Sequence, residues 1–331
     1  MQLARMFSGW TQSFLLLSIM TTSGCVSDGS RRDRPAIAEA SAVQFLTREV
    51  PAWSRNNGCF SCHNNGDGAR ALYAAVRKGY RVPARILAET TAWVAHPDRW
   101  EHNKGDPGFS DQRLANIQFA ASLLAALEGG LTTDRRPLQE AARKVCVDQG
   151  ADGAWHIEPR NVVGSPATYG TTLATCMALK TLKQADAPGT SDAIRKAEDW
   201  LRQARPNNVL SAATLLLASA GVSEKSADAR RDECFTVIQH GQTREGGWGP
   251  YADSPAEPFD TAIVLLSLTK HRSETGVEEM IRRGRSFLAS RQNPDGSWPA
   301  TTRPPGGTSY AQRISTTAWA TLALLATRGS P

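Results

Sequence analysis

A recurring turn motif constrains the fold of this 331-residue chain more than any other feature. In three places an apolar pattern of helical period ends near a Gln, and a Gly turn and a Trp follow. The three copies contain Gln149 and Trp155, Gln239 and Trp248, and Gln292 and Trp298. Repetition of one local unit is typical of folds built by packing similar helical pairs side by side.

Two kinds of helix alternate between these turns. The runs 263–268 and 319–325, which follow two of the tryptophans, are apolar on all sides and must be buried all round. The segment before Trp298 has apolar residues on one face only, and its other face is charged. The pattern predicts outer helices around Phe45, Trp93, Val145, Trp200, Phe235 and Phe287, and inner helices around 71–73, 117–119, Leu173, 215–217, Val264 and Leu322. We therefore expect an all-α, double-walled ring of about six helix pairs.

The Gln…Gly-Xaa-Trp stretches resemble the QW motifs of squalene–hopene cyclases and related terpenoid cyclases. Residues 283–298 are the most similar stretch, and the resemblance covers about residues 41–328. It implies the α/α toroid that these cyclases share with the β subunits of protein prenyltransferases. It also implies that the repeat tryptophans clamp neighbouring repeats by packing. A shared fold does not by itself imply a shared activity.

The acid of the hopene-type cyclases has no counterpart at the matching position. That family protonates an alkene with the central Asp of an Asp-Xaa-Asp-Asp motif, and the corresponding stretch here is 257–260. Phe259 stands where the proton donor would be, and we interpret Asp260 as a helix N-cap. No Asp, Cys and His arrangement matches the zinc site of the prenyltransferases. Both activities are therefore disfavoured by the sequence, and whether the chain is an enzyme is left open.

The sequence Cys59-Phe60-Ser61-Cys62-His63 matches a c-type haem attachment motif. Cys59 and Cys62 would form thioether bonds to haem c, and His63 would be the proximal iron ligand. His96 and His102 are candidate distal ligands. A Cys59–Cys62 disulfide, a zinc site lacking a further ligand, and a relic of a haem-binding ancestor are the alternatives.

The N-terminus predicts export. Residues 1–24 are typical of a signal peptide, and Thr22-Ser23-Gly24-Cys25 resembles a lipobox with Cys25 as the lipidated first mature residue. Polar residues at 25–40 predict a flexible tether, and the toroid is expected over 41–331. We expect a periplasmic or outer-surface protein anchored to the membrane by lipid.

The motif and the export signal together predict an exported toroid that carries covalent haem c and acts in electron transfer or redox-linked ligand binding. Its expected partner is a redox protein or a hydrophobic small molecule. A net charge of +6 without a dense basic block argues against nucleic-acid binding. The alternatives are a non-catalytic binding scaffold and a cyclase-like enzyme.

Overall fold

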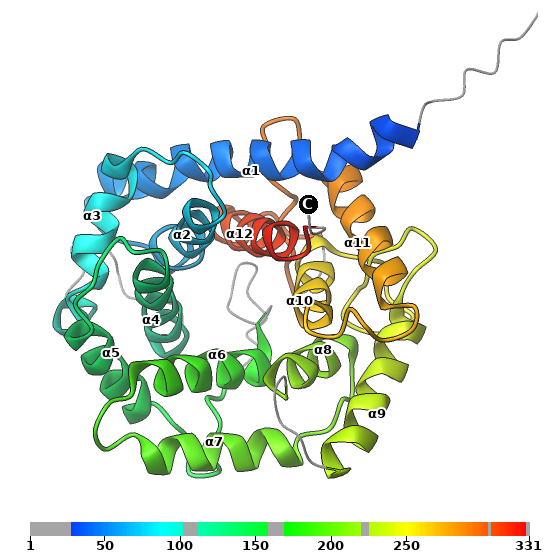
Figure 1. The fold of residues 1–331 in the computed structure, drawn as a ribbon. Coiled ribbons are helices and arrows are strands. Elements are labelled where there is room, and N and C mark those ends of the chain that lie inside the picture. The colour runs from blue at the N-terminus through cyan, green and yellow to red at the C-terminus, as the bar shows by residue number, and fades with distance from the viewer. Residues whose placement is uncertain (1–27, 102–111, 158–168, 220–224, 304–305, 329–331) are drawn as a thin grey trace, which may run out of the picture.

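The computed structural model describes residues 28–101, 112–157, 169–219, 225–303 and 306–328. In these residues it contains twelve α-helices and no strand, arranged as two concentric layers around a common axis (Figure 1). The outer helices are α1 (Asp28–Asn57), α3 (Ala84–Val94), α5 (Arg136–Val147), α7 (Ser191–Gln203), α9 (Lys225–Gly241) and α11 (Val277–Arg291). The inner helices are α2 (Ala69–Arg77), α4 (Gln112–Glu128), α6 (Gly170–Ala185), α8 (Val209–Ala218), α10 (Pro258–Leu268) and α12 (Tyr310–Ala326). The predicted α/α toroid is confirmed.

The ring closes through both layers. Each inner helix packs against the next, and α12 packs against α2, while α11 packs against α1 in the outer layer. The inner helix α10 is buried almost all round, as its apolar sequence requires: every residue except Leu266 is buried. The first pair also contains a short π-helix, η1 (Cys62–Gly68), between α1 and α2.

The repeated Gln joins consecutive repeats. The side-chain amides of Gln149, Gln242 and Gln292 each donate to the carbonyl of the Gly four residues later. The same amides donate to carbonyls of the next outer helix, α7, α11 or α1, namely those of Ala193, Met280 and Ala38. The spacing of four residues from Gly246 explains why Gln242, and not the expected Gln239, makes this bridge.

The Gly of each turn lies against the outer helix of the following repeat. Gly153, Gly246 and Gly296 all have positive φ, and a Cβ on Gly296 would lie 2.4 Å from the carbonyl oxygen of Ser41. This close approach fastens the last repeat to α1 and closes the ring. Only glycine combines this backbone conformation with so short a distance.

Replacing Gly296 by Ala should therefore destabilise the protein more than an alanine at positive φ does where no neighbouring atom is in the way. Gly306 is the matched control, because its φ is +89 but nothing lies within 4 Å of its missing Cβ. We expect Gly306→Ala to cost about 1–2 kcal/mol and Gly296→Ala about 1–3 kcal/mol more, because a backbone must move. Urea unfolding measures both. Equal losses would show that the contact with Ser41 has no part in closing the ring.

The N-terminal helix begins earlier than the sequence predicts. α1 starts at Asp28 and continues through Pro35 and Pro51, so the segment expected to be a tether is helical from Asp28 onward. Ala38 and Glu39 are buried in it. The signal sequence and Cys25 lie outside the described residues, and their roles stay predictions. Among the helices that are described, none is both long enough and apolar enough to span a bilayer.

Candidate active site

A carboxylate lies fully buried among the inner helices. Asp67, at 0% exposure, is near the end of η1. The hydroxyl of Tyr169, at the N-terminus of α6, lies 2.6 and 2.7 Å from its two oxygens. Its Oδ2 also accepts from Gln118 Nε2 of α4 at 2.8 Å and from Ser315 Oγ of α12 at 2.6 Å. Donors from three repeats therefore converge on one side chain.

The segment that carries Asp67 is polar in sequence but buried in the fold. The hydroxyl of Ser61 caps η1 by accepting from two backbone N–H groups. The side-chain amides of Asn64 and Asn65 donate to carbonyls of α1. A Cβ on Gly66 would lie 3.0 Å from that of Gln118, so α4 approaches the backbone closely. Hydrogen bonding is what allows so polar a run to be buried.

Three aromatic rings cluster where the Tyr169 hydroxyl binds Asp67. The rings of Tyr169, Phe259 and Trp319 lie 5.7, 5.7 and 5.9 Å apart, centroid to centroid. The indole N–H of Trp319 donates to the Tyr169 hydroxyl at 2.7 Å. Burial is the main cause that raises the pKa of Tyr169 well above its ordinary value, and the negative charge of Asp67 adds to it. The phenol of Tyr169 therefore keeps its proton.

The repeat register explains where Phe259 points. The backbone N–H groups of Trp248 and Trp298 donate to Thr261 and Thr317, which are therefore equivalent in their repeats. Two positions earlier stand Phe259 and Ser315, and Ser315 contacts Asp67. Phe259 accordingly occupies an inward-facing position and contributes an apolar wall. The carboxylate that Ser315 contacts, Asp67, comes instead from the first repeat.

A second buried carboxylate, Asp260, faces the loop after Trp298. Arg303 donates to Asp260 Oδ2 and to Glu257 Oε2, both at 2.6 Å. The N-cap of α10 is Glu257, so the expected N-cap role of Asp260 is wrong: it lies in the first turn and binds a loop residue. Burial and the neighbouring Glu257 raise the pKa of Asp260 to about 6, although Arg303 opposes the shift.

This pKa predicts a dependence of stability on pH. The folded protein holds a proton on Asp260 that the unfolded chain releases at a lower pH, so this stabilisation is complete below about pH 4. It is lost as the pH rises through about 6, by as much as about 3 kcal/mol. Unfolding experiments on the protein and Asp260→Asn between pH 4 and 8 measure it. An unchanged pH slope in the variant would contradict this assignment.

The Cys-Xaa-Xaa-Cys-His sequence runs from the loop after α1 into the first two residues of η1. Cys59 is only 3% exposed, whereas Cys62 and His63 are partly exposed. His63 Nδ1 lies 3.3 Å from the sulfur of Cys62, and burial lowers the pKa of its ring. η1 itself packs against α4 and α12. Cys59 and Cys62 are free thiols in this structure, and their role in haem attachment stays a prediction.

The structure describes one of the two candidate distal ligands. His96 is half exposed, and its Nδ1 lies 3.8 Å from Asp98. His102 lies outside the described residues. Where the chain is described, no three His, Cys, Asp or Glu side chains gather as a metal site requires.

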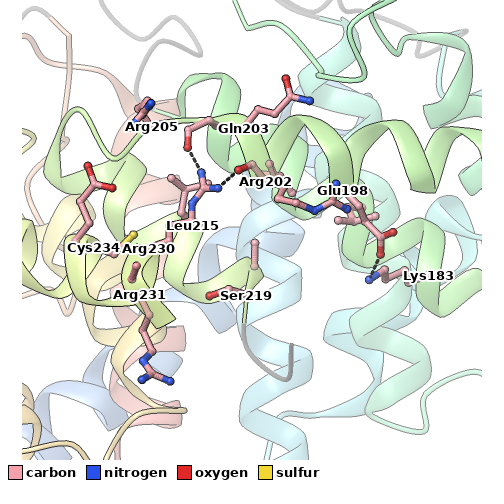
Figure 2. A pocket seen from close by; sticks show the side chains of 16 residues that line it. Lys183, Glu198, Arg202, Gln203, Arg205, Leu215, Ser219, Arg230, Arg231 and Cys234 are labelled. Carbon is pink, nitrogen blue, oxygen red and sulfur yellow. Dashed lines mark hydrogen bonds and ion pairs between the residues drawn. The ribbon is translucent and has the colours of Figure 1, made fainter. Parts of the chain in front are cut away.

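A groove of about 810 Å³ lies at the rim of the ring, between α6, α7, α8 and α9 (Figure 2). Arg230 there donates to the carbonyls of Arg202 and Ala204 at the end of α7, and Lys183 pairs with Glu198. Burial raises the pKa of Cys234 to about 11, so its thiol is not an activated nucleophile. These side chains cap and pair helices, and the Asp67 cluster is the stronger candidate.

Comparison with known proteins gives the class of fold. No family model matches the chain, and no curated protein matches its sequence. Type II terpene cyclase MstE from Scytonema, in complex with its substrate geranylgeranyl dihydroxybenzoate, superposes with a TM-score of 0.59 at 14% identity, over 90% of this chain and 98% of that one. Its complex with the product merosterolic acid A gives 0.61 at 14%, over 91% and 99%. A protein from Actinoplanes gives 0.56 at 17%, over 89% and 100%.

These similarities correct the expected function. The solved neighbours of this fold include a terpene cyclase bound to its isoprenoid substrate and to its product. The expected haem-dependent electron transfer or redox-linked binding is therefore wrong. The motif is short and statistically conspicuous, but its residues are used here to cap and pack η1. The central cluster of Asp67, Gln118, Ser315 and Trp319 was not expected from the sequence, and Tyr169 was not singled out as a binding residue.

Proposed function

We propose that this protein is a terpene-cyclase-like enzyme that cyclises an isoprenoid chain within the ring of inner helices. The observation that carries the proposal is the fully buried Asp67 beside the aromatic rings of Tyr169, Phe259 and Trp319. An isoprenoid chain is apolar, and its cyclisation passes through carbocations. Aromatic faces stabilise such cations, and an apolar wall excludes water that would quench them.

Asp67 is the candidate acid. In a proton-initiated cyclisation its carboxyl proton would pass to an alkene carbon, and a ring would form by attack of a second alkene on the cation. Loss of a proton from the cyclic cation to solvent, with uptake of a solvent proton by the Asp67 carboxylate, would return the enzyme to its starting state. Substrate and product are then isomers. The Asp67 carboxylate left behind would be stabilised by the hydroxyls of Tyr169 and Ser315 and the amide of Gln118.

The hydrogen-bond network can also hold the protonated form of Asp67. Gln118 Oε1 is buried and has no hydrogen-bond partner among the described residues. Rotation of the amide by 180° exchanges its oxygen and nitrogen, which would turn an acceptor toward a protonated Asp67. The Phe259 that replaces the family's central acid then serves as part of the wall around a relocated acid.

The test is incubation of the purified protein with isoprenoids of different chain length and head group, squalene included, followed by mass spectrometry. We expect a product of unchanged mass and fewer double bonds from at least one of them. Recovery of every substrate unaltered by a folded protein would favour the scaffold alternative.

A further inference from the structure

Arg70 reaches across the centre of the ring. It begins on α2, its guanidinium stacks on the ring of Trp319 of α12 at 4.0 Å, and its Nη1 lies 3.7 Å from the sulfur of Met177 on α6. The side chain is 12% exposed. Three inner helices therefore hold one cation beside the aromatic wall, and the interaction with Trp319 fixes the plane of the guanidinium.

The hydrogen-bonding capacity of this guanidinium is largely unused. Nε and Nη2 are buried, and neither has a hydrogen-bond partner in the described part of the chain. The nearest carboxylate oxygen, Asp67 Oδ1, is 4.0 Å from Nη2, beyond hydrogen-bond range. Both Asp67 oxygens already accept from Tyr169. Leaving donors of a buried charge unsatisfied is costly, which points to an acceptor brought by a ligand.

The two unused donors lie on one edge of the guanidinium. That Nε and Nη2 edge offers two parallel N–H groups, the geometry that binds both oxygens of an oxyanion. Arg70 would also repel a carbocation formed nearby, and an anion on the substrate, together with the Asp67 carboxylate 4.0 Å from Nη2, reduces that repulsion.

We propose that Arg70 binds the carboxylate of an isoprenoid acid, so that the substrate of this site carries one anionic head group. The inference rests on the proposed function and names its substrate class. A single negative charge suits the site because Asp67 lies beside Arg70, and a diphosphate brings more negative charge than one guanidinium can compensate. When the head group is bound to Arg70, the adjacent rings of Trp319, Phe259 and Tyr169 lie along the isoprenoid chain of the substrate.

Equilibrium binding tests this separately from turnover. Geranylgeranoic acid, geranylgeraniol and geranylgeranyl diphosphate share one chain and differ at the head group, and isothermal titration calorimetry gives a Kd for each. We expect the acid to bind at least about tenfold more tightly than the alcohol, the gain of one charged bidentate contact. The diphosphate should bind less tightly than the acid.

The variants are Arg70→Gln, Arg70→Lys and the control Arg77→Gln. Arg77 is on the same helix but half exposed, paired with Glu128. We expect Arg70→Gln to abolish the preference for the acid without weakening the binding of the alcohol. Arg70→Lys should keep part of the preference for the acid, and Arg77→Gln should keep all of it. Equal binding of acid and alcohol by the unaltered protein, a preference that survives in Arg70→Gln, or tightest binding of the diphosphate would overturn the inference. A preference for the acid without any cyclic product would instead defeat only the proposed function.

Discussion

Replacing Asp67 by asparagine is expected to reduce cyclisation by at least about a thousandfold, which corresponds to about 4 kcal/mol in the barrier. The amide has nearly the same shape but cannot give up a carboxyl proton. Its oxygen can still accept from Tyr169 and Ser315, so the variant should fold and bind substrate. Product formation in single-turnover reactions with saturating substrate measures the change.

Two matched variants separate chemistry from packing. Asp260→Asn changes the other buried carboxylate of the inner helices, which binds Arg303 at the loop end, and should retain most activity at constant pH. Tyr169→Phe keeps the aromatic wall but removes one donor to Asp67, so a partial loss of turnover is expected. If Asp67→Asn turned over as fast as the unaltered enzyme, Asp67 would not be the acid.

Removing the indole of Trp298 should have the largest effect on stability. This side chain is 0% exposed, and its Nε1 donates to the carbonyl of Leu288 at 2.8 Å. Trp298→Ala leaves a large cavity at the turn where the last repeat meets α1, and we expect a loss of about 3–5 kcal/mol in the free energy of unfolding. Denaturant unfolding measures it.

The control for this substitution is Tyr251→Ala. Tyr251 is another aromatic residue of a post-Trp loop but is 57% exposed, so its removal should change stability by less than about 0.5 kcal/mol. Comparable losses in the two variants would refute the view that the repeat tryptophans clamp the ring.

The repeat architecture could be read from the sequence because its determinants are local. A Gln, a Gly at positive φ and a Trp recur within one turn, and the all-round apolarity of segments such as α10 allows only an inner position. The error at Gln239 was a matter of spacing: the bridging amide is the one four residues before Gly246. The early start of α1 was missed because residues 28–34 are rich in Asp, Ser and Arg, yet Ala38 accepts the bond that closes the ring.

The central cluster could not be predicted because its members are brought together only by ring closure. Asp67 and Ser315 are at opposite ends of the chain but 2.6 Å apart. In sequence, Asn64-Asn65-Gly66-Asp67-Gly68 looks like an exposed loop, and its burial depends on amide contacts with α1. The neighbouring Cys59 and Cys62 illustrate the opposite case: a short pattern with a strong chemical association led to a predicted redox function that the structural comparison contradicts.

Cyclisation in deuterium oxide shows where the initiating proton comes from, because Asp67 as the acid would take up a solvent proton before each turnover. With an isoprenoid acid as substrate, we expect a cyclic isomer that carries one solvent deuterium at the carbon first protonated, with no such product from Asp67→Asn. A cyclic product free of deuterium, or the same labelled product at the same rate from the variant, would contradict it.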